Sequence, residues 1–177
     1  LTLYNLLYLQ PIIFSNSPMD KAFAEHLLSF VSENKQSKFK EILENRTRYL
    51  TVVLEDIYQP HNASAVLRSC DCFGVQDVHI IENRNKYNVN PHIAVGSAKW
   101  LNLNYHNKQE ENTIACINEL KAKGYKIVAT TPHKDDVMLP ELPIDQPIAL
   151  LFGTEQEGLT DVALEHADAY MRIPMYG

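Results

Sequence analysis

Short apolar runs rich in β-branched residues alternate with helical segments along most of this chain. Residues 49–82 contain one such run, a helical segment that ends near Gly74, and a second run, which together have the size of one βαβ unit. Strands that alternate with helices indicate a mostly parallel sheet with helices on both faces. The sequence therefore predicts the α/β fold class.

The same pattern predicts the remaining elements of the sheet. The expected strands are 49–54, 77–82, 101–105, 125–130, 147–152 and 170–174, and the expected helices are 62–73, 110–123 and 160–168. Ligands bind beyond the carboxyl ends of parallel strands. We therefore expect the functional site in the loops that follow Leu54, Thr130, Phe152 and Ile173.

The N-terminal part differs in character from the rest. Residues 19–48 predict a pair of helices, and residues 49–177 predict the α/β part. A length of 177 residues favours a single domain. Residues 1–18 are apolar at first but lack the basic residues of a signal peptide, and the apolar part is shorter than the roughly 20 residues that span a bilayer. Because the first methionine is Met19, we interpret 1–18 as an extension upstream of the natural start, or alternatively as an arm packed on a neighbour.

Cysteine and histidine usage excludes several classes of site. Cys70, Cys72 and Cys116 are odd in number, and the close pair is spaced C-x-C, so the sequence predicts a reduced, cytoplasmic protein. The seven histidines show no H-E-x-x-H or comparable spacing, which predicts no metal. No G-x-S-x-G motif supports serine hydrolysis.

Residues 153–158, with the sequence GTEQEG, follow an expected strand directly. They match neither the G-x-G-x-x-G dinucleotide motif nor the P-loop. Glu155 and Glu157 would repel a pyrophosphate, whereas the backbone N–H groups and carboxylates suit a neutral or cationic ligand. The alternative is a tight turn whose acidic side chains are simply solvated.

Residues 59–70 supply the second candidate. A proline turn brings Asn62 to the start of a helix, where it acts either in the site or only as a helix cap. Arg68 has apolar neighbours, which predicts a largely buried helix in which an arginine needs an anionic partner or a functional cleft. At about 100° per residue, Asn62 and Arg68 do not share one helix face.

Three segments in order, 54–74, 151–159 and 173–175, together with 96–100 and 128–132, resemble the motifs of the TrmH family in the SPOUT superfamily. The resemblance implies an RNA 2′-O-methyltransferase that uses S-adenosylmethionine. It favours the D-loop guanosine of tRNA as the target, because residues 20–48 leave no room for a separate RNA-binding domain. Ribosomal RNA methylation and a non-catalytic RNA-binding module with the SPOUT fold are the alternatives.

The resemblance also implies a C-terminal trefoil knot, a homodimer and a set of site residues. The catalytic positions would be Asn62, Arg68 and Glu155, and the cofactor would be bound by Thr130, Gly153, Leu159, Ile173 and Met175. The family's third motif continues with a Ser-x-Asn-x-Ser segment and a helix, whereas this sequence stops at Gly177. We therefore expect an incompletely closed knot within these residues.

The chemistry of ribose methylation suggests roles for these side chains. An arginine guanidinium is normally protonated, so we do not expect Arg68 to act as a base. We expect it to bind a phosphate and to stabilise the negative charge that develops on the alkoxide oxygen. Glu155 would orient Asn62 or backbone amides.

The formal net charge of −6 is unevenly distributed along the chain. Residues 135–177 contain nine acidic residues and one arginine, so the earlier part is slightly basic. The expected RNA-binding residues are Lys35, Lys38, Lys40, Arg46, Arg48 and Arg68. The alternative for the residues of 35–48 is a solvated helix face.

Overall fold

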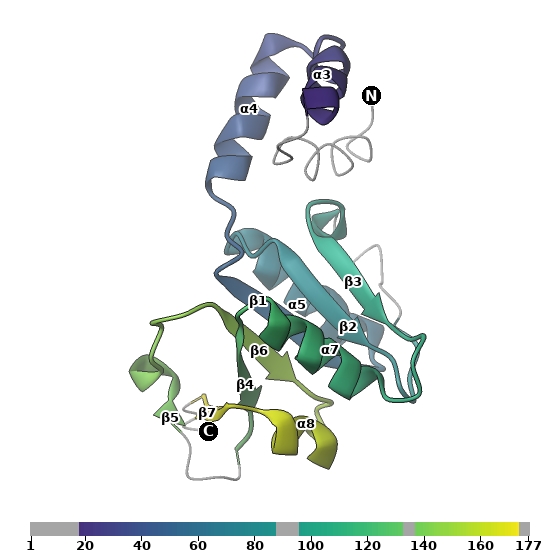
Figure 1. Cartoon of the computed structure of the whole chain (residues 1–177), viewed down its shortest axis with the longest axis vertical. Helices are drawn as coiled ribbons and strands as arrows, with labels where there is room; N and C mark the ends of the chain where they lie inside the picture. The colour runs from purple at the N-terminus through teal and green to yellow at the C-terminus, as the bar shows by residue number, and fades with distance from the viewer. Residues whose placement is uncertain (1–17, 88–95, 133–136, 174–177) are drawn as a thin grey trace.

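A seven-stranded, entirely parallel sheet forms the centre of the molecule (Figure 1). The computed structural model describes residues 18–87, 96–132 and 137–173. The strand order is β3-β2-β1-β6-β4-β7-β5. The strands are β1 (Leu50–Glu55), β2 (Asp77–Ile81), β3 (Asn102–His106), β4 (Lys126–Thr130), β5 (Val137–Met138), β6 (Ile148–Phe152) and β7 (Ala169–Arg172).

Helices cover both faces of this sheet. Helix α5 (Pro60–Cys72) and the short 3-10 helix η1 (Ser97–Lys99) pack on one face, and α7 (Asn112–Ala122) and α8 (Asp161–His166) pack on the other. A second 3-10 helix, η2 (Leu139–Glu141), follows β5. The predicted α/β class, with a mostly parallel sheet and helices on both faces, is confirmed.

The central strand β1 explains why its sequence reads as a continuous apolar run. Val52 and Leu54 join the core on the α5 face, whereas Val53 joins the core on the α7 face. A parallel strand that is buried on both sides needs apolar residues at consecutive positions rather than at alternate ones. This double burial is what the sequence pattern detects.

Two helices precede the sheet and extend beyond it, α3 (Pro18–Leu28) and α4 (Glu33–Glu44) (Figure 1). The Gln36 side chain donates hydrogen bonds to the carbonyl oxygens of Leu28 and Val31, which fixes the turn between the helices. None of the α4 residues is buried. The predicted helical pair is therefore present as an exposed projection.

Three short elements were missed by the sequence analysis. Strand β5 has only two residues, and the two 3-10 helices have three residues each, so none is long enough to show a periodic pattern. Residues 1–17 of the expected N-terminal extension, the end of the third motif with Met175, and the chain end at Gly177 lie outside the described residues. Closure of the predicted knot therefore stays a prediction. Within the described ranges, no helix has the length and apolar character needed to cross a membrane.

Candidate functional site

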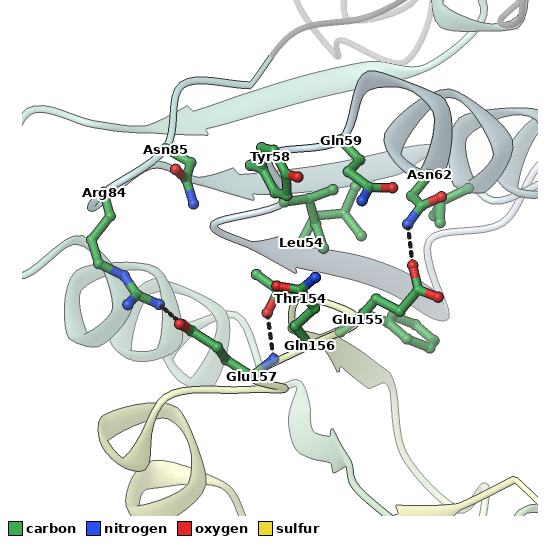
Figure 2. A pocket seen from close by; sticks show the side chains of 14 residues that line it. Leu54, Tyr58, Gln59, Asn62, Arg84, Asn85, Thr154, Glu155, Gln156 and Glu157 are labelled. Atoms are coloured by element: carbon green, nitrogen blue, oxygen red, sulfur yellow. Dashed lines mark hydrogen bonds and ion pairs between the residues drawn. The ribbon is translucent and has the colours of Figure 1, made fainter.

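A cavity of about 500 Å³ opens where β2, β1 and β6 end (Figure 2). Strands β2 and β3 follow β1 in the chain and lie on one side of it in the sheet. Strands β4 and β6 come later in the chain and lie on the other side, with β6 next to β1. The cavity therefore occupies the kind of switch point at which open α/β sheets bind ligands. The lining residues are Leu54, Ile57, Tyr58, Gln59, Asn62, Val66, Arg84, Asn85, Phe152, Gly153, Thr154, Glu155, Gln156 and Glu157.

One hydrogen bond joins the two main sequence motifs across this cavity. The Nδ2 atom of Asn62, in the first turn of α5, donates to Oε2 of Glu155 at 3.2 Å (Figure 2). Asn62 makes no side-chain capping bond, and the N-cap position is occupied by Gln59. The alternative that Asn62 serves only as a helix cap is therefore wrong, and the contact expected between Glu155 and Asn62 is present.

The loop that carries Glu155 is closed on itself by its backbone. Thr154 and Gly158 exchange two backbone hydrogen bonds of 3.0 Å, and the Thr154 hydroxyl accepts a third from the Glu157 N–H group. A Cβ atom on Gly153 would lie only 2.0 Å from the Gly158 carbonyl oxygen, so this position requires glycine. The loop is therefore a tight, preformed turn that presents two exposed carboxylates.

The loop after β2 supplies two cavity residues that the sequence analysis missed. Arg84 pairs with Glu157 at 2.8 Å, and Asn85 lies beside it on the cavity wall (Figure 2). The buried Asp56 accepts hydrogen bonds from three successive backbone N–H groups of this loop, residues 83–85, at 2.8 to 3.3 Å. The available signal was that residues 83–85 follow an expected strand, which is the position from which ligands are bound.

A buried carboxylate anchors the far side of the glutamate loop. Glu55, at the end of β1, is only 1% exposed. It accepts hydrogen bonds from the Thr113 hydroxyl at 2.6 Å and from the Thr160 backbone N–H and hydroxyl at 2.9 and 2.8 Å. Thr160 is also the N-cap of α8. Glu55 therefore connects β1, α7 and the start of α8.

The environment predicted for Arg68 is wrong. The buried residues of α5 are Ala63, Ser64, Leu67 and Cys70, and Arg68 lies about 100° round the helix from Leu67, so its side chain is exposed. Among the described residues it makes no hydrogen bond or ion pair, and it does not line the cavity. Asn62 and Arg68 thus occupy different helix faces, as expected.

The predicted cofactor residues gather only in part. Strand β4 ends at Thr130, Gly153 follows β6, and Ile173 follows β7. Because these three strands are neighbours in the sheet, the three residues lie at the same carboxyl edge. The Thr130 hydroxyl donates to the Leu151 carbonyl at 2.7 Å. Leu159 packs in the core on the α7 face, and of the four described members of the set only Gly153 also lines the cavity.

Of the expected RNA-binding residues other than Arg68, three are exposed on α4: Lys35, Lys38 and Lys40. Arg46 is nearly buried and pairs with Asp71, and Arg48 pairs with Asp77 at 2.9 Å. These two arginines hold the base of the projection against the sheet. Arg46 therefore does not belong to an open basic surface.

Comparison with known sequences decides the family. The SpoU rRNA Methylase family model matches residues 49–177. The chain belongs to the SpoU rRNA methylase family. A tRNA (guanosine(18)-2′-O)-methyltransferase from Borreliella burgdorferi is 43% identical over 151 residues, which cover 85% of this chain and 67% of that protein.

Solved structures of SpoU relatives have the same fold. The A. aeolicus TrmH/SpoU tRNA modifying enzyme superposes with a TM-score of 0.71 at 32% identity, over 82% of this chain and 72% of that one. The SpoU methyltransferase AviRb from Streptomyces viridochromogenes, solved with AdoMet, has a TM-score of 0.59 at 22% identity, over 75% and 51%. The second likeness concerns the fold alone.

Proposed function

We propose that this SpoU protein transfers the methyl group of S-adenosylmethionine to the ribose 2′-hydroxyl of a guanosine in tRNA, in the cytoplasm. The observation that carries the proposal is the Asn62–Glu155 hydrogen bond, which joins two segments 93 residues apart at a cavity in the sheet's switch point. The relatives named as guanosine 2′-O-methyltransferases of tRNA support the choice of substrate.

The residues at the edge formed by β4, β6 and β7 fit this cofactor. Thr130, Gly153 and Ile173 would hold it, with Leu159 behind them, and Met175 completes the set that the family resemblance implies. The closed turn 153–158 offers acidic side chains beside a ligand whose sulfonium group is cationic. When bound, S-adenosylmethionine supplies an electrophilic methyl group, so the protein has no covalent intermediate to form.

Asn62 and Glu155 would position the ribose. Because Glu155 accepts from Asn62 Nδ2, the Asn62 amide is held in one orientation at the cavity wall. Its carbonyl oxygen is then available to accept a hydrogen bond from the ribose hydroxyl. In-line methyl transfer requires such alignment of hydroxyl oxygen, methyl carbon and sulfur.

Arg68 would act on the RNA backbone. Its exposed guanidinium, unpaired within the described ranges, suits contact with a phosphate next to the target ribose. There it would stabilise the negative charge that develops on the 2′-oxygen, while the proton leaves to phosphate or water. Because Arg68 lies outside the cavity of its own chain, we propose that two chains form a homodimer in which both approach the RNA.

Exposed residues around the cavity and on α4 would bind the rest of the RNA. Tyr58 is 57% exposed at the rim and offers a ring on which a base can stack. Lys35 and Lys38 are three residues apart on one face of α4, which suits contacts with successive phosphates.

The proposal is tested by nucleoside analysis of RNA from cells with and without the gene. We expect 2′-O-methylguanosine to disappear from tRNA in the deletion strain and to return with the wild-type gene but not with the Asn62→Ala variant. A methylated nucleoside lost from ribosomal RNA instead would support the ribosomal alternative. Unchanged methylation of both RNAs would favour the non-catalytic module.

A further inference from the structure

A second cluster of reactive side chains lies on the opposite face of the sheet from α5. His79 of β2, His106 of β3 and Cys116 of α7 place one ligand atom each within 4.8 Å of one another. His79 is 3% exposed and Cys116 is completely buried. None of the three lines the cavity described above, and none is used in the proposed methyl transfer.

We propose that His79, His106 and Cys116 form a binding site for Zn²⁺. Two imidazoles and one thiolate are ligands that zinc prefers, and three protein ligands leave the fourth tetrahedral position to water. The three residues come from two neighbouring strands and the helix packed on them. The bound ion would therefore fasten α7 to the edge of the sheet.

The spacing of the donor atoms fits a tetrahedral ion after small movements. Nδ1 of His79 and Nε2 of His106 are 3.0 Å apart. In a tetrahedral zinc site, ligand atoms at 2.0 to 2.3 Å from the metal lie about 3.3 to 3.8 Å from one another. The two imidazole nitrogens would separate by about 0.3 Å. The sulfur lies within 4.8 Å of both and would move toward them by up to about 1.2 Å, to the roughly 3.6 Å expected between nitrogen and sulfur ligands.

The surroundings of the imidazoles support ligation. Burial lowers the pKa of His79 to about 4, and burial also lowers the pKa of His106, so both rings are neutral and keep a lone pair near pH 7. The second nitrogen of His106, Nδ1, lies 4.0 Å from a carboxylate oxygen of Glu119. A shift of about 1 Å would bring this carboxylate within hydrogen-bond distance of the ring, where it would orient a metal-bound imidazole.

Zinc binding would remove the proton of the Cys116 thiol. Burial raises the pKa of Cys116 to about 12, so without a metal the side chain is a thiol. As the sulfur–zinc bond forms, the S–H bond breaks and the proton leaves to solvent. Lys123 pairs with Glu119 at 2.6 Å and neutralises it, so the Cys116 thiolate is the group that offsets charge on the ion.

The edge position gives an ion access to this buried cluster. β3 is the outermost strand of its end of the sheet, and the His106 side chain is 11% exposed. The sequence analysis predicted no metal because the ligands are separated by 27 and 10 residues and match no short motif. Strand pairing and helix packing, rather than local spacing, bring them together.

Competition with a chromogenic zinc chelator tests the site on the purified protein. We expect one Zn²⁺ per chain and at least tenfold weaker binding in Cys116→Ser and His106→Gln. The exposed residues Cys72 and His61 provide matched controls, because Cys72→Ser and His61→Gln should bind zinc like the wild type.

Cobalt substitution gives a readout specific to the thiolate. The wild type and Cys72→Ser should show a sulfur-to-cobalt charge-transfer band, and Cys116→Ser should lack it. His106→Gln replaces a partly exposed residue, so it keeps the test valid if Cys116→Ser fails to fold. Equal zinc affinity of the wild type and His106→Gln, or no charge-transfer band in the wild type, would overturn the proposal, whatever RNA the protein methylates.

Discussion

Asn62 and Glu155 form the contact on which the proposed chemistry depends. They lie in different sequence motifs and meet at 3.2 Å on the cavity wall. If each acts through the other, replacing both should cost less than the two single changes suggest. Double-mutant kinetics with Asn62→Ala and Glu155→Ala should give a coupling energy of about 0.5 to 3 kcal/mol in kcat/KM.

Glu157 supplies the matched control for this cycle. It lies in the same loop, is also exposed, and pairs with Arg84 rather than with Asn62. The effects of Asn62→Ala and Glu157→Ala should therefore add to within about 0.5 kcal/mol. Additive effects of Asn62→Ala and Glu155→Ala would show that the hydrogen bond has no role in turnover.

Arg68 tests whether the shape of the guanidinium matters as well as its charge. Lysine keeps the positive charge but not the planar fork that binds phosphate with two parallel hydrogen bonds. We expect Arg68→Lys to bind tRNA nearly as well as the wild type and to lower kcat by about a hundredfold or more. Filter binding and single-turnover kinetics separate the two effects, and near wild-type turnover would contradict the assigned role.

Among the secondary-structure elements, the buried Glu55 side chain connects β1, α7 and the start of α8, and it does not line the cavity. In the wild type, the Thr113 hydroxyl and the Thr160 N–H and hydroxyl groups all donate to the Glu55 carboxylate. A glutamine at this position would place its own N–H₂ donor against one of these donors and leave that donor unpaired. We expect Glu55→Gln to lower the free energy of unfolding by about 1 to 3 kcal/mol. Urea denaturation measures this loss.

Glu165 is the control for Glu55, because it is an exposed glutamate in α8 itself. Its change to glutamine should alter the free energy of unfolding by no more than about 0.5 kcal/mol. If both variants unfold at the same urea concentration as the wild type, Glu55 does not anchor α8.

The elements were predictable where their sequences carry a local signal. Strands such as β1 and β6 are buried on both faces, so their apolar runs mark them. The loop of Arg84 and Asn85 was not identified as part of the site, because its place at the cavity depends on β2 lying next to β1 and on the buried Asp56. The burial of Arg68 was predicted wrongly because successive residues lie about 100° apart on a helix, so apolar neighbours in sequence do not show that a position is buried.

For the whole molecule, the charge distribution predicts how RNA is approached. Lys35 and Lys38 share one face of helix α4, whereas Lys40 lies on another side of the helix. Each lysine that contacts a phosphate contributes just under one unit to the slope of log affinity against log salt concentration. Replacing both Lys35 and Lys38 by Glu should reduce that slope by up to about two units.

The Lys40→Glu variant controls for net charge alone. It lowers the charge of the same helix but on another side, so it should change the slope less than either Lys35→Glu or Lys38→Glu. Tritiated tRNA bound at several salt concentrations gives these slopes. Equal slopes for all variants and the wild type would assign α4 to a solvated surface.

The proposed methylation of a guanosine ribose in tRNA, with Asn62 and Glu155 at the site, can be measured directly. The most direct measurement is transfer of a deuterated methyl group from labelled S-adenosylmethionine to purified tRNA and, separately, to ribosomal RNA. Mass spectrometry of ribonuclease fragments locates the label, and mass spectrometry of the nucleosides identifies it. We expect deuterated 2′-O-methylguanosine from the D-loop of tRNA, reduced at least tenfold by Asn62→Ala. Label in another nucleoside, label in ribosomal RNA only, or equal label with wild type and Asn62→Ala would contradict it.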